Sequence, residues 1–506
     1  MVRRIHRIVL LFVLLLSPSL SSLSPRVAGI FSFITGQLNC PLMAVHFLAL
    51  PRQTLSSLSP AWQGLFFQMW VKKYRFGQKT QKIFGQFKKL LYICTVKSAQ
   101  NTKLCTVESA NQINKVMIDA SLLQYMKEQL DLTSVDFKRY LYDQMDWNKR
   151  LQCLLGGRGV GKSTMVKQHI IETPEEHSLY VSADHSYFTV HTLIELADEF
   201  VKEGGDHLYI DEIHKYDGWS REIKQIYDTH PALKVFITGS SILDLLDGEA
   251  DLSRRIIMRH LHGMSFREYL KLVHKIDVPV YSLEEILAGN AQPKALPHPL
   301  PLFRQYLRDG YYPFSLEGDF QERMQNVIRQ TMESDIPHYA KMSPATGRKL
   351  RQMLSIVAQN APYKPESQTL ANELHISRND VPSYLLFMEK AEMIGQLRDD
   401  TGGMRGLGKV EKVYLNNTNI QYALVGEKAE IGNVRETFFY NQLHVTQDVI
   451  SSRVSDFSVG EYTFEVGGKK KGKKQISEVP NGYVVRDEIE YAANQIIPLW
   501  AFGLMY

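Results

Sequence analysis

Eight consecutive residues have the types and spacing of a phosphate-binding loop. Residues 156–163 read Gly-Gly-Arg-Gly-Val-Gly-Lys-Ser, which satisfies the pattern G-x-x-x-x-G-K-[ST] in full. An apolar run ending at Leu155 precedes the loop, and a helix-forming stretch follows from Thr164. Glycines let consecutive backbone N–H groups point inward, and the N-terminus of the following helix adds its positive end. This strand–loop–helix context predicts a cradle for phosphate groups.

The loop residues have distinct expected roles. Lys162 would reach the β- and γ-phosphates of a nucleotide, and the hydroxyl of Ser163 would bind Mg²⁺. A glycine-rich loop without function is the alternative, but it gives no folding reason for Lys-Ser at the helix start. The other residues expected to bind the nucleotide are Gly156, Gly157, Arg158, Gly159, Val160, Gly161 and Thr164.

A short apolar strand that ends in two acids is the expected second half of the site. His207-Leu-Tyr-Ile-Asp211 is followed directly by Glu212. A carboxylate at a strand end beside the phosphate loop can hold the Mg²⁺ shell, which we assign to Asp211. Glu212 points elsewhere and is expected to polarise the attacking water as general base. Two solvated acids at a strand exit are the alternative.

A third strand, residues 234–241, ends in small hydroxyl residues. In many P-loop ATPases such a strand lies between the other two, and its polar tip senses the γ-phosphate. Ser240 is the first candidate for this role, with Thr238 or Ser241 as alternatives. A simple turn would also explain these residues.

Four segments together resemble a prokaryotic group of AAA-type ATPases that carry a C-terminal restriction-endonuclease-like domain. They are Tyr209–Tyr216, Thr238–Ser241, Ser253–Arg255 and Ser265–Leu270. The resemblance covers roughly residues 117–506 and is most specific in the ATPase half. It implies ATP and Mg²⁺ as ligands and ATP hydrolysis as the activity.

The same resemblance implies an arginine that faces the γ-phosphate. Arg255 matches the expected position, acting either from a neighbouring subunit or within its own chain. Arg254 is the second choice, and a surface charge near a helix end is the alternative for both.

Composition is that of a multidomain protein. At 506 residues the chain is too long for a single core. The net charge of +5 is small for this length and does not by itself indicate nucleic acid. The four cysteines show neither metal-ligand spacing nor a disulfide framework. A cytoplasmic location, reducing and supplied with ATP, fits best.

The N-terminus disagrees with that location. Residues 3–18 have a basic head and a short apolar stretch, the outline of a secretory signal but too short for a confident membrane span. Residues 19–116 show no sustained period, although 94–100 is echoed by 105–111. We expect residues 1–116 to be a disordered or misassigned extension, with translation starting near Met117. A membrane anchor on a cytoplasmic ATPase is the alternative.

The rest of the chain predicts an α/β fold in four parts. Residues 149–270 alternate short apolar strands with helices, the pattern of a parallel sheet. Helices at 117–130 and 134–145 are expected to lead into it. The expected parts are an ATPase core at 117–270, a helical lid at 271–345, a winged helix at 346–420 and a small α+β restriction-endonuclease-like domain at 421–506.

The expected winged helix has little positive charge where a DNA-binding helix needs it. Its second helix is predicted at 381–390, with one apolar face made by Val381, Tyr384, Leu385 and Met388. The residues expected to be exposed are Asn379, Asp380, Ser383, Glu389 and Lys390. DNA-reading helices concentrate Lys and Arg instead. A structural or protein-contact role is favoured over DNA binding, homo-oligomers are an open alternative, and stable membrane association is not expected.

The C-terminal part carries two acids and a lysine of the kind that nucleases use. Asp456, Glu465 and Lys469 could hold Mg²⁺ and activate water. The spacer between Glu465 and the lysine is Val-Gly-Gly, longer than the usual single residue, so we expect no cleavage. The basic run 469–474 would bind nucleic acid or form a solvated hairpin tip.

Overall fold

The computed structural model describes residues 118–506, except residues 175, 241–251, 253, 361 and 401–407. The expected extension at 1–116, and also Ser241 and Ser253, therefore lie outside the described residues. In the described part of the chain, none of the helices has the length and apolar character needed to cross a membrane.

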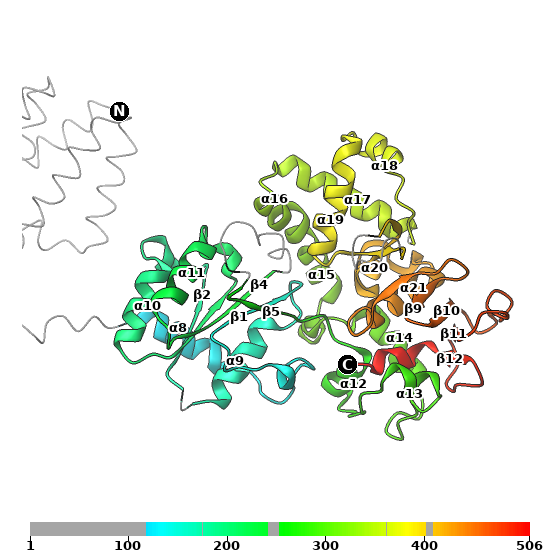
Figure 1. Ribbon diagram of the computed structural model, residues 1–506, viewed down its shortest axis with the longest axis horizontal. Coiled ribbons are helices and arrows are strands. Elements are labelled where there is room, and N and C mark those ends of the chain that lie inside the picture. Colours follow the sequence, from blue (N-terminus) through cyan, green and yellow to red (C-terminus); the bar gives the residue numbers. More distant parts are fainter. Residues whose placement is uncertain (1–117, 175, 241–251, 253, 361, 401–407) are drawn as a thin grey trace, which may run out of the picture. The chain divides into compact units, whose positions relative to one another are not determined.

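A five-stranded parallel sheet forms the N-terminal part of the described chain (Figure 1). Its strands are β1 (Leu151–Gly156), β2 (Ser178–Ser182), β3 (His207–Asp211), β4 (Lys234–Ser240) and β5 (Ile257–His260). Their order is β2-β3-β4-β1-β5, and every pair is parallel. Strands β1 to β4 are mostly apolar and almost fully buried, as expected when both faces of a sheet are covered, whereas the edge strand β5 is only partly buried. The prediction that β4 lies between the other two strands of the site is confirmed.

Four helices accompany this sheet: α8 (Ala120–Asp131), α9 (Lys162–Glu172), α10 (Leu193–Lys202) and α11 (Trp219–Thr229). Helix α10 begins at a capping box in which Thr192 and Glu195 satisfy each other's backbone N–H groups. The helix expected at 117–130 is present as α8.

The helix expected at 134–145 is absent, apart from the single turn η2 (Tyr142–Gln144). Several backbone groups before this turn bond to distant side chains. Gln168 Nε2 donates to the carbonyls of Ser134 and Phe137, each at 2.8 Å, and Tyr140 N donates to Glu268 Oε1 at 2.6 Å. These tertiary bonds satisfy the peptide groups that a helix would have paired.

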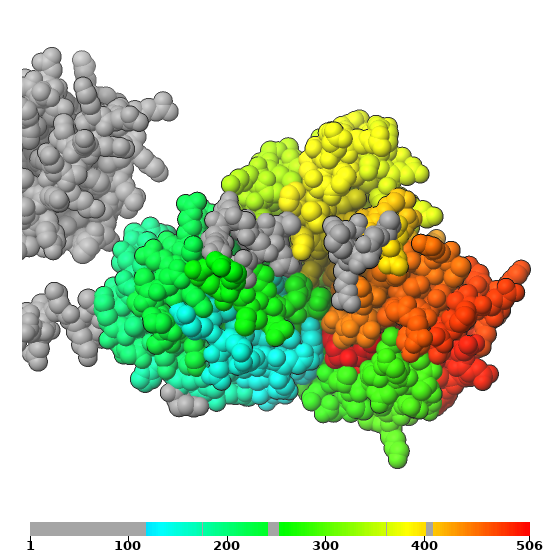
Figure 2. Space-filling view, viewed as in Figure 1, coloured from blue at the N-terminus to red at the C-terminus, as the bar shows by residue number. Residues whose placement is uncertain are grey.

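The segment expected to form one helical lid, 271–345, is divided between two cores. After α12 (Phe266–His274), helices α13 (Leu283–Leu287) and α14 (Pro299–Asp309) share apolar contacts with the C-terminal strands. In Figure 2 the green segment with α13 lies against the red end of the chain. After the turn η6 (Pro313–Glu317), α15 (Phe320–Gln330), the π-helical turn η7 (Thr331–Asp335) and α16 (Ile336–Tyr339) share a core with the next helices.

Three helices and a hairpin follow, which we call the helix–hairpin unit (residues 344–415). The helices are α17 (Pro344–Asn360), α18 (Ser367–Leu374) and α19 (Val381–Lys390), and β6 (Ile394–Arg398) pairs antiparallel with β7 (Val410–Leu415). In α19, Val381, Leu385 and Met388 are buried as expected. Glu389 is not fully exposed, because its carboxylate is paired with Arg398 at 2.7 Å.

A mixed five-stranded sheet closes the chain. Helices α20 (Thr418–Val425) and α21 (Ile431–Leu443) precede it. Its strands are β8 (Val449–Ser451), β9 (Phe457–Val459), β10 (Tyr462–Gly467), β11 (Gly482–Arg486) and β12 (Ile496–Pro498), in the order β12-β11-β10-β9-β8, and the turn η10 (Leu499–Leu504) follows them. Helix α21 is buried on several sides, with Val434, Phe438 and Phe439 each at most 1% exposed.

Candidate active site

The phosphate loop joins the end of β1 to the start of α9, as predicted. Gly159 and Gly161 have φ angles of 84° and 100°, which favour glycine. A Cβ atom on Gly159 would lie 2.6 Å from the ring of Phe314, and one on Gly156 would collide with the carbonyl oxygen of Leu261. Close packing and backbone conformation both require these glycines.

Lys162 lies at the first position of α9 and is only 5% exposed. Its Nζ donates to the carbonyl oxygens of Gly156 and Gly157, each at 2.9 Å. Burial lowers the pKa of the ammonium, an effect that Glu212, Glu392 and Asp211 oppose. The charged group is thus held inside the loop by backbone oxygens.

Asp211 ends β3, and hydroxyl groups from both neighbouring strands hold its carboxylate. Tyr180 of β2 donates its phenol hydrogen to Oδ2 at 2.6 Å, and Thr238 of β4 donates to Oδ1. Thr238 also accepts a hydrogen bond from the backbone N–H of Glu212 at 3.2 Å. Ser240, the predicted sensor, stands opposite Gly156 in the β4–β1 pairing, so it borders the loop.

Glu212 follows Asp211 with a left-handed φ of 52°, which turns its side chain away from the strand direction. Burial raises the pKa of this carboxyl, although Lys162 opposes the shift. His214 Nε2 lies 3.3 Å from Glu212 Oε2, and burial lowers the pKa of this histidine to about 4. Glu212 is therefore a base with raised proton affinity beside a neutral imidazole at neutral pH.

The oxygen atoms here fit a magnesium ion that is bound together with phosphate. Ser163 on α9 and Asp211 on β3 are the expected protein ligands. Within the described part of the chain, no group of three or more His, Cys, Asp or Glu side chains could hold a metal ion by itself. Mg²⁺ does not need such a group, because it usually keeps several waters and takes one or two protein oxygens plus substrate phosphates.

Arg255 does not reach the phosphate loop of its own chain. Its Nε is paired with Asp228 Oδ1 at 3.1 Å, at the end of α11. The carbonyl of the adjacent Tyr227 accepts from Arg150, which precedes β1. Arg255 thus lies at the start of the strands, about 20 Å from the loop for a strand of six residues. This position favours action on a neighbouring subunit over action within the same chain, and the role of Arg255 stays a prediction.

Arg139 supports the loop from outside, and no motif in the sequence pointed to it. The guanidinium forms a buried ion pair with Glu268 at 3.0 Å. It also donates to the carbonyl of Val160 in the loop and to that of His262 at 2.7 Å. Glu268 belongs to the predicted motif Ser265–Leu270, so half of this pair was detectable.

Two acids from beyond the sheet also contact the site and were not predicted. Asp335 Oδ2 is paired with Arg158 Nη2 of the loop at 2.9 Å, and its Oδ1 lies 3.5 Å from Lys215 Nζ. A Cβ atom on Gly157 would lie 2.9 Å from Glu392 Oε2, so this carboxylate lies against the loop.

The second predicted site, in the C-terminal sheet, differs in its lysine. Lys471 is paired with Glu465 Oε1, and Ser455 donates to Oε2, so both oxygens are engaged. Asp456 accepts from the backbone N–H of Val466 at 3.0 Å and lies 3.4 Å from Lys412. Lys471 takes the place expected of Lys469.

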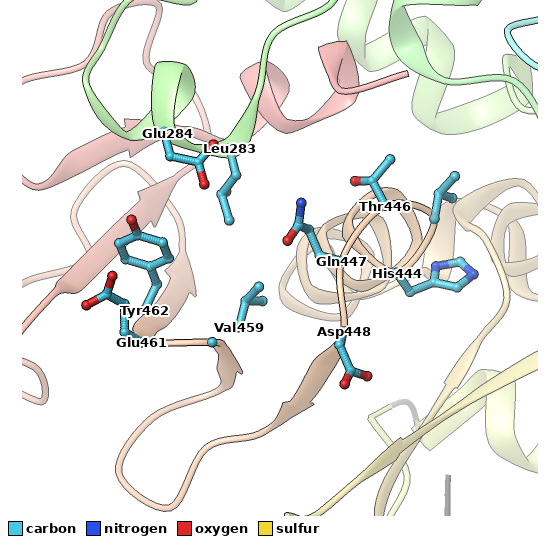
Figure 3. A pocket seen from close by; sticks show the side chains of 11 residues that line it. Leu283, Glu284, His444, Thr446, Gln447, Asp448, Val459, Glu461 and Tyr462 are labelled. Carbon is cyan, nitrogen blue, oxygen red and sulfur yellow. The ribbon is translucent and has the colours of Figure 1, made fainter. Parts of the chain in front are cut away.

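A pocket of about 620 Å³ lies in the C-terminal half of the chain (Figure 3). Leu283 and Glu284 of α13 line one side, and Gln447 and Tyr462 belong to the segments after α21 and at the start of β10. No residue of 148–270 lines this pocket. It is separate from the phosphate loop.

Comparisons with known proteins agree with the geometry of the loop. Residues 148–270 match the family model of the AAA domain. This match and the parallel sheet support a P-loop AAA-type domain in this part of the chain. Residues 300–430 of the chain match a domain of unknown function, DUF8612, which runs across the predicted boundary between lid and winged helix.

Similarities over longer parts of the chain carry less information. "Uncharacterized protein MJ1637" of Methanocaldococcus jannaschii is 25% identical over 441 residues, covering 77% of this chain and 92% of the relative. AMPPCP-bound DnaA from Aquifex aeolicus is 14% identical with a TM-score of 0.23, covering 54% of this chain and 90% of that one. PCH-2 of C. elegans is 18% identical with a TM-score of 0.21, covering 57% and 72%. These TM-scores are too low to support an argument about the fold. The fold assignment therefore depends on the strand order of the sheet and on the match to the AAA family model.

Proposed function

We propose that the AAA domain binds ATP with Mg²⁺ and hydrolyses it. The observation that carries this proposal is the shared edge of the sheet where Lys162, Asp211 and Glu212 meet around the loop. Lys162 would exchange the carbonyls of Gly156 and Gly157 for the β- and γ-phosphates. When bound, Mg²⁺ would neutralise phosphate charge, held by Ser163 and Asp211.

Glu212 would act as general base in this proposal. Its buried carboxyl has a raised pKa, which makes it a better proton acceptor than a solvated glutamate. Asp211 would not compete for this role, because Tyr180 and Thr238 donate to its two oxygens. Ser240, beside Gly156, would contact the γ-phosphate.

Nucleotide turnover would move the helix–hairpin unit, which resembles a winged helix in having three helices followed by a hairpin. Two contacts support this coupling. Glu392 belongs to the helix–hairpin unit and Asp335 lies shortly before it, and both contact the loop. The weak positive charge of α19 favours a protein partner over DNA. A cytoplasmic location accords with ATP as substrate.

A slow nucleotide-gated switch is the second candidate, and the position of Arg255 favours it. An isolated chain would lack this arginine at its own site, whereas a homo-oligomer would supply it from a neighbour. Arginine fingers contribute roughly 10³-fold or more to hydrolysis. Arg255→Ala is then expected to slow hydrolysis about that much in an oligomer and to leave a monomer unchanged.

ATP hydrolysis by the purified chain, with and without DNA, tests the proposal. We expect Mg²⁺-dependent phosphate release that Lys162→Ala abolishes. Stimulation by DNA would favour a nucleic-acid-linked enzyme, whereas slow hydrolysis that DNA does not change would favour the switch. Absence of Lys162-dependent hydrolysis at any protein concentration would contradict the ATPase proposal.

A further inference from the structure

Glu392 is an unusual neighbour for a phosphate loop. It follows α19 with a left-handed φ of 56° and is 8% exposed. Its Oε2 lies against Gly157, while its Oε1 is 3.0 Å from Nε2 of His260, the last residue of β5. A left-handed conformation is costly for a residue other than glycine and occurs mostly where the surroundings fix it. The turn after α19 thus places a carboxylate directly on the loop.

Glu392 keeps its negative charge because of the basic side chains around it. Burial alone would raise its pKa, but His260, His262 and Lys162 outweigh burial and lower the pKa to about 2. A buried carboxylate is stable only when cations compensate its lost hydration. Lys162 of the phosphate loop is thus one of the groups that stabilise the Glu392 carboxylate.

Asp335 is a second carboxylate that pairs with a cation of the loop. It ends the π-helical turn η7, and its side chain is 8% exposed. Its two oxygens bridge Arg158 of the loop and Lys215, which follows the acids of β3. Turns of this type interrupt helices mostly at functional positions.

A triphosphate needs the same cations. Lys162 and Arg158 belong to the segment that binds phosphate, and each faces a carboxylate from beyond the sheet. Phosphate oxygens brought to Gly157 would stand next to Glu392 Oε2, and like charges at short range in a buried site repel strongly. The loop cannot satisfy the γ-phosphate and both carboxylates at once.

We propose that Glu392 and Asp335 are intramolecular competitors of the γ-phosphate, so that ATP binding releases the helix–hairpin unit from the loop. This rests on the proposed ATP binding and deepens it by naming the contacts that ATP breaks. Because coupling between two binding events is reciprocal, the docked unit weakens ATP binding as much as ATP weakens docking.

Affinity for a non-hydrolysable ATP analogue tests the competition. Glu392→Gln keeps the shape of the side chain but removes its charge, so we expect roughly 5- to 100-fold tighter binding, the usual range of such coupling. ADP, which lacks the γ-phosphate, should gain much less. Glu389→Gln is the matched control: Glu389 lies in α19, three residues away, and pairs with Arg398, so its loss should leave both affinities unchanged.

The second test measures the distance between the AAA domain and the helix–hairpin unit. Spin labels at exposed Lys202 of α10 and Glu373 of α18 report on the two parts, after Cys40, Cys94 and Cys105 are replaced by serine. The ATP analogue should lengthen or broaden the distance distribution. The Glu392→Gln and Asp335→Asn double variant should show part of that change without nucleotide.

The outcomes separate this device from the ATP site itself. Lys162-dependent binding with equal affinities in the parent chain and Glu392→Gln, and an unchanged label distance, would overturn the device and leave ATP binding intact. Tighter binding of ADP and the ATP analogue by the same factor would also overturn it, because the γ-phosphate would then play no part. No nucleotide binding by the parent chain would overturn both proposals.

Discussion

The phenol of Tyr180 on β2 donates a hydrogen bond to Oδ2 of Asp211 on the neighbouring strand β3, at 2.6 Å. Thr238 on β4 engages the other oxygen. The carboxylate proposed to hold Mg²⁺ is therefore oriented by the strands on both sides of it. Such outer partners fix the aim of a metal ligand and are typically worth 10- to 100-fold in affinity or activity.

Tyr180→Phe removes this hydrogen bond and keeps the ring. We expect roughly tenfold slower hydrolysis and a higher Mg²⁺ requirement, with nucleotide affinity in the absence of metal unchanged. A titration of hydrolysis rate against Mg²⁺ measures this. Tyr125→Phe is the control, because the ring of Tyr125 stacks on Tyr180 and the substitution keeps that stack. Equal Mg²⁺ curves for Tyr180→Phe and the parent chain would remove Tyr180 from this role.

Glu212→Gln should bind ATP and lose most turnover, because the substitution removes the base and leaves the metal ligand. In the parent chain the base must be deprotonated. Burial raises its pKa above the ordinary value, so hydrolysis should fall as the pH drops through that raised pKa and should level off above it. A pH–rate profile with ATP binding measured in parallel checks both. Parental turnover in Glu212→Gln would assign the base to another residue.

Glu268→Gln tests the support beneath the loop. The ion pair with Arg139 is nearly inaccessible, with side chains 5% and 2% exposed, so the substitution leaves a buried guanidinium with a weaker partner. Breaking such a pair costs about 3–5 kcal/mol. Chemical denaturation should register a loss of this size, whereas Lys271→Gln, which breaks an exposed pair with Asp277, should change stability by less than about 1 kcal/mol. Similar losses in both variants would contradict the assignment.

The C-terminal sheet is expected not to cut DNA. The ammonium of Lys471 forms an ion pair with Oε1 of Glu465, so a metal ion would have to displace this cation to reach the carboxylate. Incubation of supercoiled DNA with the chain and Mg²⁺ or Mn²⁺ should give no nicked product. Metal-dependent nicking that Asp456→Ala abolishes would show that this expectation is wrong.

Features fixed by neighbouring residues were predictable from the sequence. Local residue types were enough to predict the loop at 156–163, the acids at the end of β3 and the strand at 234–240. The sheet brings these three segments together in the expected order. The AAA match at 148–270 falls within the predicted core at 117–270. A local sequence pattern is enough to predict a site whose residues are close together in the chain.

Features fixed by distant partners were not predictable. Arg139 meets Glu268 across 129 residues, and Gln168 takes the carbonyls that a helix at 134–145 would have used. Glu392 reaches the loop only because the turn after α19 docks there. Arg255 matched a motif, yet Asp228, with which it forms an ion pair, lies at the other end of the sheet. Such contacts follow from packing, which residue types alone do not specify.

Binding of ATP by Lys162→Ala and by the parent chain is the most direct test of the central claim. Isothermal titration with a non-hydrolysable ATP analogue and Mg²⁺ should give a saturable signal for the parent chain. The same titration should give none for Lys162→Ala, since that substitution removes the ammonium held inside the loop. Circular dichroism should show both proteins equally folded. Equal affinities in the two folded proteins would contradict the account, because the nucleotide would then bind elsewhere.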